Sequence, residues 1–427
     1  MKKILLGCIA DDFTGATDLA NNLVRAGMRA VQTIGVPEKA LAGEADAVIV
    51  ALKSRTAPPK EAVGASLAAL RWLQAQGARQ IYFKYCSTFD STPQGNIGPV
   101  AEALLDAVTP TGTPGFTIAT PAFPDNQRTV FKGHLFVGDV LLHESGMQNH
   151  PLTPMTDSNL VRVLQAQCGR KVGLIDYAVV AAGENAIRAR IAELRAQGIG
   201  IAVVDVISND DLHKLGPALR DMPLVTAGSG VAIGLPANCG IAPSNAASAL
   251  PRPAGLQAIV SGSCSTATNR QVQAFVRAGG PAFQVDPLRV GAGEDVAGKA
   301  LTWAEPLLAH GPVLIYSTAD PIAVKAIQQQ LGVQRAGTVT EETLATIARG
   351  LTEVGVRQLV IAGGETAGAC VQALGVTQLK IGPQIDPGVP WCHAQATAVG
   401  NVGLHLALKS GNFGADDFFA KSFASLA

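Results

Sequence analysis

Apolar runs alternate with amphipathic segments along the first half of the chain. Residues 3–10 form an apolar run that predicts a buried strand, and apolar residues follow at helical spacing from Ala16 to Val24. The same unit then repeats, with strands predicted at 45–52, 80–84, 116–120, 171–176, 200–205 and 223–229 and helices at 61–76, 96–108 and 179–197. Strands that alternate with helices at this spacing indicate a mostly parallel sheet covered by helices on both faces.

The pattern lapses between residues 236 and 257, where Pro, Ala, Ser and Asn dominate without periodicity, as in a linker. The alternation then restarts, with strands predicted at 257–262, 282–286, 313–318, 358–364 and 378–382 and helices at 267–278, 294–309, 340–355 and from Thr366. We therefore predict two α/β domains, residues 1–240 and 258–427, joined by a linker at 241–257. Each domain should have a mostly parallel sheet flanked by helices, and the active site should lie in the interdomain cleft.

The composition restricts which kinds of partner the chain can bind and which cellular compartment is expected for it. Lys+Arg and Asp+Glu both number 33, so no net charge draws the chain towards nucleic acid or a membrane surface. The seven cysteines include no C-x-x-C pair, which favours a reduced cytoplasm over a disulfide framework or a zinc site. The histidines show no metal-ligand spacing, and no metal ligands are predicted. The start, MKKILLGC, resembles a lipoprotein signal, but its apolar run is too short and two aspartates follow at once. A cytoplasmic protein is expected.

Polar side chains follow the predicted strands of the first half. Ligands of open parallel sheets bind at the carboxyl ends of the strands, so these loops are the candidate site. The candidate substrate-binding residues are Asp11, Ser54, Arg55, Lys84, Ser91, Asn96 and Arg128, and the candidate catalytic residues are Asp12 and Asp90. Lysine and arginine pair with a carboxylate, while aspartate and asparagine accept hydrogen bonds from hydroxyls. Together they predict a site for a small polyhydroxylated anion.

Structural roles compete with this interpretation at each position. Asp11, Thr14 and Thr17 stand where a helix begins, and capping explains them as well as a ligand does. Asp12 is harder to explain as a cap, because one cap suffices and adjacent like charges repel. Arg55 taken alone is better explained as a solvated loop charge than as a ligand. The position of Asp90 on a long polar loop, directly before Ser91 and Thr92, favours a functional role.

Small glycine-bearing turns follow strands of the second half. SGSCSTAT (261–268) and AGGETAGA (362–369) each run from a strand into a helix, and AVGNVG (398–403) is a third such turn. Free amides at a helix N-terminus bind anions, and absent side chains let a polyphosphate approach, although tight packing also calls for glycine. No turn matches the Walker P-loop, and none has the G-x-G-x-x-G pattern with a later acid that a dinucleotide fold requires. The turns favour a nucleotide site other than NAD(P).

Several long motifs resemble the four-carbon acid sugar kinase family. They are IADDFTGATD (9–18), KYCSTFDSTPQGNIGPV (84–100), PAFPDNQRTV (121–130), ESGMQNHPLTPMTDSNL (144–160), VSGSCS (260–265) and AGGETAGA (362–369). They occur in order over essentially the whole chain. KYCSTFDST and HPLTPMTDSNL resemble the 3-oxo-tetronate kinase branch, whereas D-threonate and D-erythronate kinases usually carry K-x-D-S-T-L-R-G-N. This chain has Pro93 and Gln94 in place of that Leu-Arg pair.

The resemblance implies an N-terminal acid-sugar domain, a C-terminal nucleotide domain and transfer of phosphate from ATP to the C4 hydroxyl of a four-carbon sugar acid. The residues it implies for ATP are Ser261, Ser263, Gly363, Gly364, Glu365, Thr366, Gly400 and Gly403. Such a transfer needs Mg²⁺ and a group that takes the hydroxyl proton, and we expect Asp12 in that role with Asp90 in reserve. Glu365 would hold Mg²⁺ through water, or simply cap its helix.

Other functions stay open at this point. A D-threonate or D-erythronate kinase of the same family, an NAD(P)-dependent sugar-acid dehydrogenase and a sugar-acid-binding protein without activity are the alternatives. The expected partner is a small sugar acid, with no nucleic acid and no membrane. A homodimer is only the base-rate expectation for the assembly.

Overall fold

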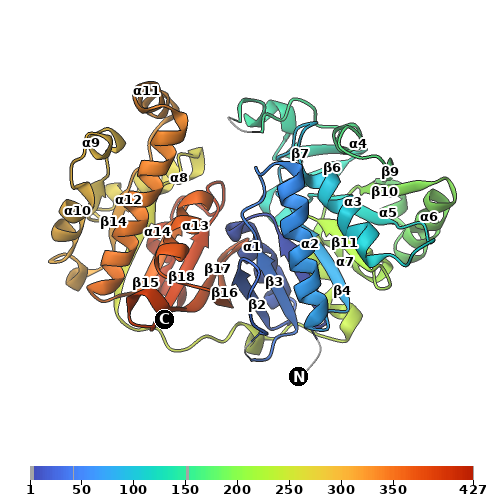
Figure 1. Cartoon of the computed structure of the whole chain (residues 1–427), viewed down its shortest axis with the longest axis horizontal. Coiled ribbons are helices and arrows are strands. Elements are labelled where there is room, and N and C mark those ends of the chain that lie inside the picture. Colours follow the sequence, from blue (N-terminus) through green and yellow to red (C-terminus); the bar gives the residue numbers. More distant parts are fainter. Residues whose placement is uncertain (1–3, 42, 151–152, 427) are drawn as a thin grey trace. The chain divides into compact units, whose positions relative to one another are not determined.

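The computed structural model describes residues 4–41, 43–150 and 153–426 (Figure 1). The chain divides into two compact units, Met1–Ser248 and Ala249–Ala427, which we call unit 1 and unit 2. Each unit is an α/β structure with a mostly parallel sheet flanked by helices, which confirms the predicted fold class.

The sheet of unit 1 is built from parallel pairings. Its strand order is β2-β3-β1-β4-β11-β5-β10-β9. The strands are β1 Leu6–Ala10, β2 Ala30–Ile34, β3 Ala47–Ala51, β4 Gln80–Lys84, β5 Thr117–Thr120, β9 Lys171–Ile175, β10 Ile199–Val204 and β11 Leu224–Ala227. Strands β1 and β3 are buried along their whole length, as expected of a parallel sheet covered on both faces.

Helices connect these strands. They are α1 Phe13–Arg25, α2 Pro59–Ala75, α3 Ile97–Val108, α4 Leu160–Gln165, α5 Tyr177–Ala181, α6 Glu184–Ala196 and α7 Asn209–Ala218. Helix α1 packs on β2 and β3, whereas α2 packs on β1 and beside α3 (Figure 1). The predicted helices at 61–76 and 96–108 correspond closely to α2 and α3.

Helices α4 and α7, strand β2 and a small second sheet of unit 1 were not predicted. Strand β2 contains Gln32 and Thr33, which interrupt its apolar run, and both are buried because they hydrogen-bond to the carbonyls of Phe13 and Gly35. The second sheet is antiparallel and consists of short strands, β6 Arg128–Phe131, β7 His134–Val137 and β8 Val140–Leu141. Such short strands carry too little alternation to be recognised in a sequence.

The sheet of unit 2 has the order β13-β14-β12-β15-β18-β17-β16. Its strands are β12 Leu256–Ser261, β13 Ala282–Gln284, β14 Val313–Tyr316, β15 Val356–Ala362, β16 Gln378–Asp386, β17 Val389–Ala396 and β18 Val402–Lys409. The neighbouring strands β13, β14, β12, β15 and β18 pair in parallel. Strand β17 pairs antiparallel with both β18 and β16. The antiparallel meander at 378–409 was predicted only as a strand near 378–382 and a glycine turn.

The helices of unit 2 are α8 Thr266–Arg277, α9 Pro287–Gly291, α10 Val296–Ala304, α11 Pro321–Leu331, α12 Val333–Glu353, α13 Gly364–Ala373 and α14 Phe418–Lys421. The predicted helix at 340–355 begins earlier, at Val333, directly after Gly332 in a left-handed conformation. The buried Trp391 anchors the C-terminal segment, because its indole nitrogen donates to the Ser422 carbonyl and its ring packs on Phe423.

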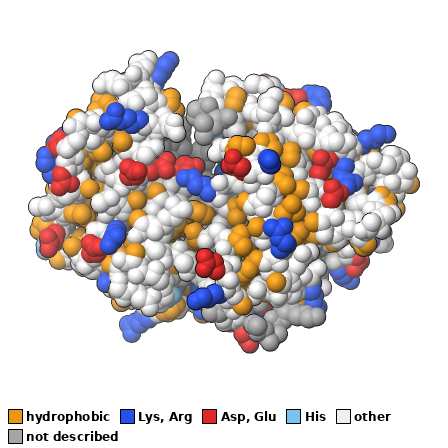
Figure 2. All heavy atoms as spheres, viewed as in Figure 1, with side chains coloured by type: hydrophobic (Ala, Val, Ile, Leu, Met, Phe, Trp, Pro, Cys, Tyr) orange, Lys and Arg blue, Asp and Glu red, His pale blue; other side chains and the backbone are white. Residues whose placement is uncertain are grey.

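Charged side chains of both signs are scattered over the face of the molecule shown in Figure 2, as the equal counts of acidic and basic residues suggest. Within the described part of the chain, no helix combines the length and apolar character that a membrane span requires.

Candidate active site

The carboxyl ends of neighbouring strands place the predicted substrate residues of unit 1 at one edge of its sheet. In the parallel register, Ala10 of β1 pairs with Ala51 of β3 and Lys84 of β4, and Lys84 pairs with Ala227 of β11. The loops that follow these residues therefore begin side by side. They carry Asp11, Asp12, Ser54, Arg55, Asp90, Ser91, Asn96 and Ser229.

Arg55 forms a two-sided ion pair with both aspartates. Its Nε and Nη2 donate to Asp11 Oδ2 and Oδ1 at 2.8 and 2.9 Å, and Nη2 lies 2.7 Å from Asp12 Oδ1. Burial alone would lower the pKa of Arg55, but the two carboxylates outweigh it and hold that pKa well above its usual range. Arg55 is therefore part of a buried charge network and not a solvated loop charge.

The helix cap is Asp12, not Asp11. Asp12 Oδ1 accepts from the Gly15 amide at 2.8 Å, and Oδ2 accepts from Thr14 Oγ1 at 2.9 Å. Capping, one of the two explanations left open for Asp11, does not apply, because Asp11 precedes the cap residue and its carboxylate binds Arg55, whereas Asp12, which was harder to explain as a cap, is the cap. Asp12 thus has both a capping role and a place in the charge network.

Lys84 lies behind the two aspartates and is buried. Its Nζ donates to the Tyr85 carbonyl at 2.8 Å. A Cβ at Gly15 would overlap the Asp12 carboxylate and approach Lys84 Nζ to 2.9 Å, so only glycine lets these groups pack here. Burial would raise the pKa of Asp12, but the charges of Arg55 and Lys84 outweigh it and keep that carboxylate ionised.

Asp18 is a site residue that the sequence analysis missed. It is 2% exposed, one and a half turns after Asp12 on α1, and its Oδ1 has no hydrogen-bond partner among the described residues. Burial raises the pKa of Asp18 to about 6, against the opposing effect of Lys84. The sequence does contain a pattern from which Asp18 could have been recognised. Polar residues recur at helical spacing at Thr14, Thr17, Asp18 and Asn21, and a polar face on an otherwise buried helix needs hydrogen-bond partners.

Arg128, at the start of β6, also has unused hydrogen-bonding capacity. Its Nη1 donates to the Asn126 carbonyl, while its buried Nε has no partner among the described residues. Burial lowers the pKa of Arg128, and the carboxylates of Asp18 and Asp90 oppose that shift. Arg128 therefore lies close enough to Asp18 and Asp90 to feel their charges, and its role in substrate binding stays a prediction.

The loop 85–96 is held by its own hydrogen bonds and by one strained residue. Phe89 is buried with φ of 52°, a conformation that bulky residues rarely adopt, and its ring packs edge-on against Tyr85. Asp90 follows it and accepts from Thr88 Oγ1 at 2.6 Å. Strain of this kind persists where surrounding contacts impose it, and the hydrogen bond from Thr88 fixes the Asp90 carboxylate.

Two predicted substrate residues of this loop mainly hold other segments. Asn96 Nδ2 donates to the carbonyls of Ser54, Arg55 and Ala57 at 2.7–3.2 Å, so it fixes the turn that carries Arg55. Ser91 Oγ accepts from Gln167 Nε2 at 2.9 Å and is buried. The Ser54 side chain is buried beneath the same turn.

In unit 2, three parallel strands end together below two helix N-termini. Ser261 of β12 pairs with Ala362 of β15, which pairs with Lys409 of β18. A Cβ at Gly363 would lie 3.1 Å from the Ser263 amide nitrogen, and one at Gly262 would overlap Thr366 Oγ1. The turns before α8 and α13 therefore pack together through glycine, and the exposed Gly364 and Glu365 begin α13. We call this arrangement of residues 262–265 and 363–366 the glycine cradle.

The two serines predicted for the nucleotide have different roles. Ser261 is fully buried and hydrogen-bonds to Thr318 Oγ1 at 2.7 Å, so its hydroxyl links the end of β12 to the loop after β14. Ser263 lies within the cradle and accepts from the Ser265 amide at 3.3 Å. Ser265, not predicted, caps α8 through the Thr268 amide.

The loop after β18 completes the cradle and was also missed. A Cβ at Gly411 would lie 2.5 Å from Ser263 Oγ, and the Gly411 carbonyl accepts from Ser265 Oγ at 2.6 Å. Lys409 is fully buried, and its Nζ donates to Thr268 Oγ1 and to the carbonyls of Ser410, Gly411 and Phe413 at 3.0–3.2 Å. Burial lowers the pKa of Lys409 to about 7, while the ring of oxygens favours the ammonium form.

Gly400 and Gly403 do not join the cradle. Gly403 lies near the start of β18, six residues before Lys409, and Gly400 precedes that strand. At about 3.3 Å per residue, six residues span roughly 20 Å, so both glycines lie towards the opposite edge of the sheet. Both glycines thus lie apart from the cradle and their assignment to ATP stays a prediction, whereas Gly411 at the carboxyl end of the same strand lies beside Ser263.

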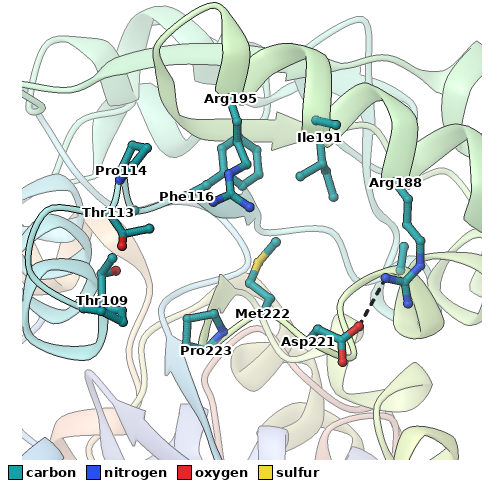
Figure 3. Close-up of a pocket in the computed structure, with 14 residues that line it drawn as sticks. Thr109, Thr113, Pro114, Phe116, Arg188, Ile191, Arg195, Asp221, Met222 and Pro223 are labelled. Carbon is teal, nitrogen blue, oxygen red and sulfur yellow. Dashed lines mark hydrogen bonds and ion pairs between the residues drawn. The ribbon is translucent and has the colours of Figure 1, made fainter.

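The pocket shown in Figure 3 is separate from these sites. It has a volume of about 390 Å³ and is lined by Phe116, Ile191, Met222 and the arginines 188 and 195, among others. Phe116 immediately precedes β5 and lies at the amino end of that strand, whereas the candidate residues of unit 1 lie at carboxyl ends. None of the predicted site residues lines this pocket.

No group of three or more His, Cys, Asp or Glu side chains within the described ranges is placed to hold a metal ion. The cysteines are free thiols. Unit 1 thus offers a buried, mixed-charge site suited to a small hydroxylated anion, and unit 2 offers backbone amides at two helix N-termini suited to phosphate.

Family models match both units in the order that these sites suggest. A model described as a sugar-binding N-terminal domain matches residues 6–235, and one described as a nucleotide-binding C-terminal domain matches residues 258–419. The chain belongs to the family of two-domain sugar-acid kinases that combines these domains, the four-carbon acid sugar kinase family.

Similar proteins extend over nearly the whole chain. A 3-oxo-tetronate kinase of Burkholderia multivorans is 60% identical over 99% of this chain and 97% of its own length, and one of Haemophilus influenzae is 46% identical over 97% and 98%. The crystal structure of Haemophilus influenzae protein HI1011 has a TM-score of 0.77 at 45% identity, covering 99% of this chain and all of that one. A structure from Salmonella typhimurium LT2 has a TM-score of 0.85 at 44% identity, covering 98% of both chains.

Proposed function

We propose that this protein is an ATP-dependent kinase that phosphorylates the C4 hydroxyl of a 3-oxo-tetronate. The relatives of that name, aligned over nearly their full length, support the substrate class. The observation that carries the proposal is that each unit offers a site of different chemistry. A buried site with Asp12, Asp18 and Arg128 suits a hydroxylated carboxylate, and the glycine cradle suits a polyphosphate.

The acid would bind at the carboxyl ends of β1, β3, β4 and β11. Arg128 and Lys84 supply positive charge for its carboxylate, with Arg55 held in place to orient Asp11 and Asp12. The amides of Gly363 and Gly364 would cradle phosphate, and Ser263, Thr366 and the 410–414 loop would support them. The reaction requires the hydroxyl held by unit 1 to reach the phosphate held by unit 2 during turnover.

In the transfer step, the C4 oxygen bonds to the γ-phosphorus as the bond from that phosphorus to the β-phosphate oxygen breaks. Asp12 takes the hydroxyl proton, with Asp90 as the alternative acceptor, and ADP leaves. Mg²⁺, when bound, would neutralise charge on the phosphates. It usually takes only one or two protein carboxylates besides phosphate and water, which fits the exposed Glu365 in the first turn of α13.

A coupled ADP-release assay tests the proposed function. The substrates are 3-oxo-tetronates, D-erythronate and D-threonate, each with ATP and Mg²⁺, and a parallel assay follows NAD(P)⁺ reduction. We expect ADP release with a 3-oxo-tetronate at a kcat/KM above that for the reduced acids. Preference for D-threonate or D-erythronate would contradict the substrate, and reduction of NAD(P)⁺ without ADP release would contradict the kinase.

Replacing Gly363 with alanine tests the cradle. Gly363 has φ of 121°, and an added Cβ would come within 3.1 Å of the Ser263 backbone nitrogen, so the turn must shift. Losing a phosphate hydrogen bond of about 1.5–3 kcal/mol should raise the Kd for ATP by roughly 10- to 100-fold in calorimetry. The matched control is Gly337→Ala on helix α12, where the new Cβ meets nothing closer than 3.8 Å. Equal ATP affinity in the two variants would remove the cradle from nucleotide binding.

A further inference from the structure

Three buried polar groups from separate segments of unit 1 each leave one atom without a hydrogen-bond partner. They are Asp18 Oδ1 on α1, Arg128 Nε on β6 and Ser229 Oγ in the turn after β11. Asp18 and Ser229 are almost completely buried. Each such atom costs about 1–3 kcal/mol when it is left unpaired, so native proteins rarely collect them in one place.

Hydrogen bonds and close packing hold these three segments together. The Ser229 carbonyl accepts from Asn22 Nδ2 at 3.0 Å, one turn beyond Asp18 on α1. A Cβ at Gly230 would lie 3.3 Å from Phe123 Cα, and the Phe123 backbone exchanges hydrogen bonds with Arg128. The Ser229 hydroxyl and the charge of Arg128 both lower the pKa of Asp18, so both groups lie near its carboxyl, although Ser229 Oγ and Asp18 Oδ1 are not in hydrogen-bonding geometry. The three unpaired atoms therefore belong to one cluster.

The surrounding charges leave this cluster available for a ligand. Arg55 is occupied by Asp11 and Asp12, and both oxygens of Asp12 already accept hydrogen bonds. Asp18 keeps a free acceptor and Arg128 keeps a free donor. A donor beside an acceptor is the complement of a carboxylate beside a hydroxyl, which is the C1–C2 end of a 2-hydroxy acid.

We infer that Asp18, Arg128 and Ser229 form the subsite that recognises the 2-hydroxy-carboxylate end of the sugar acid. Arg128 Nε donates to the carboxylate, Asp18 accepts from the C2 hydroxyl, and Ser229 Oγ donates to the same end of the ligand. This inference rests on the proposed function and makes Asp18 a specificity-determining residue. It leaves the C4 end of the acid to Asp12.

A substrate-and-variant cycle tests the inference. The KM of wild-type protein and of Asp18→Asn is measured for the 3-oxo-tetronate and for its 2-deoxy analogue. Loss of a hydrogen bond to a charged acceptor should raise KM for the 2-hydroxy substrate about 10- to 100-fold and change it little for the analogue. The KM for ATP should stay constant. An equal effect on both acids, or no effect on either, would overturn the inference.

Thr17→Val is the matched control on the same helix. Thr17 is equally buried, but its hydroxyl is satisfied by the Thr14 carbonyl at 2.8 Å, so its loss should not distinguish the two acids. Discrimination lost in this variant as well would indicate a general disturbance of α1 and contradict a specific role for Asp18.

The pH dependence provides a second readout. Asp18 titrates near pH 6 and faces Lys84, Asp12 and Arg128. Its carboxylate accepts best when ionised, so kcat/KM for the 2-hydroxy substrate should fall as pH drops through about 6. Asp18→Asn should lack this fall, and the same fall in the variant would assign the titration to another group.

Calorimetry separates failure of the inference from failure of the proposed function. Acid binding to wild-type protein that is lost in Asp18→Asn, without ADP release by either, would support the subsite and contradict the kinase. ADP release with unchanged acid affinity in Asp18→Asn would support the kinase and contradict the subsite.

Discussion

Asp12→Asn should reduce kcat about 10²- to 10⁴-fold and leave the Kd for ATP unchanged. A positioned proton acceptor contributes a factor of this size, and the amide group cannot take the hydroxyl proton. Asparagine is as good a helix cap as aspartate, and its oxygen can still accept from the Gly15 amide. The fold should therefore survive the change, and the loss should appear in single-turnover kinetics.

The chain contains a close control for the capping function of Asp12. Asp295 caps α10 by accepting from the Gly298 amide at 2.8 Å, the same distance and spacing as in the pair Asp12 and Gly15. Asp295→Asn should leave kcat unchanged. Undiminished turnover in Asp12→Asn would exclude Asp12 as the proton acceptor, and Asp90→Asn would then be the variant to compare.

Arg55→Met should destabilise unit 1 by about 3 kcal/mol and abolish detectable turnover. Its partner Asp11 has a side chain only 6% exposed, and removing one member of a buried pair leaves the other charge without compensation. The measurement is the denaturant midpoint of unit 1, followed by fluorescence. Asp11→Asn combined with Arg55→Met should recover part of the loss, because only the Asp12 carboxylate then lacks its ion pair with Arg55.

Arg162→Met is the control for Arg55→Met. Arg162 also binds an aspartate through two nitrogens, at 2.8 and 2.9 Å to Asp157, but it lies on the surface. Surface pairs contribute little, so its midpoint should hardly move. If Arg55→Met unfolded at the midpoint of the wild type, the charge network would not stabilise the site.

The alternation of apolar and polar segments was sufficient to predict the parallel sheets, since each long helix and buried strand carries its own period. Strand β2 was not predictable, because Gln32 and Thr33 are buried by hydrogen bonds that only the folded chain supplies. The meander β16–β18 and the small sheet β6–β8 depend on pairing between segments, which a local pattern does not contain.

In the candidate site, too, some features followed from the sequence and others only from the folded chain. The rule on carboxyl ends brought Asp12, Arg55 and Lys84 together, because strand direction alone determines that edge. The roles within the edge were not predictable, since Asp12 and not Asp11 caps α1. Gly403 was assigned to ATP because it lies in a glycine-bearing turn. The direction of β18, however, puts Gly411 and not Gly403 beside Ser263. Asp18 was not recognised because it lies within a helix, where its burial depends on the folded chain.

The position of the transferred phosphate tests the central claim most directly. Phosphorus–proton correlation spectroscopy of the product formed from ATP and a 3-oxo-tetronate reports which carbon bears the phosphate. The proposed kinase predicts coupling of the phosphorus to the two C4 methylene protons. Coupling to the single C2 proton, or inorganic phosphate as the sole new phosphorus species, would contradict it.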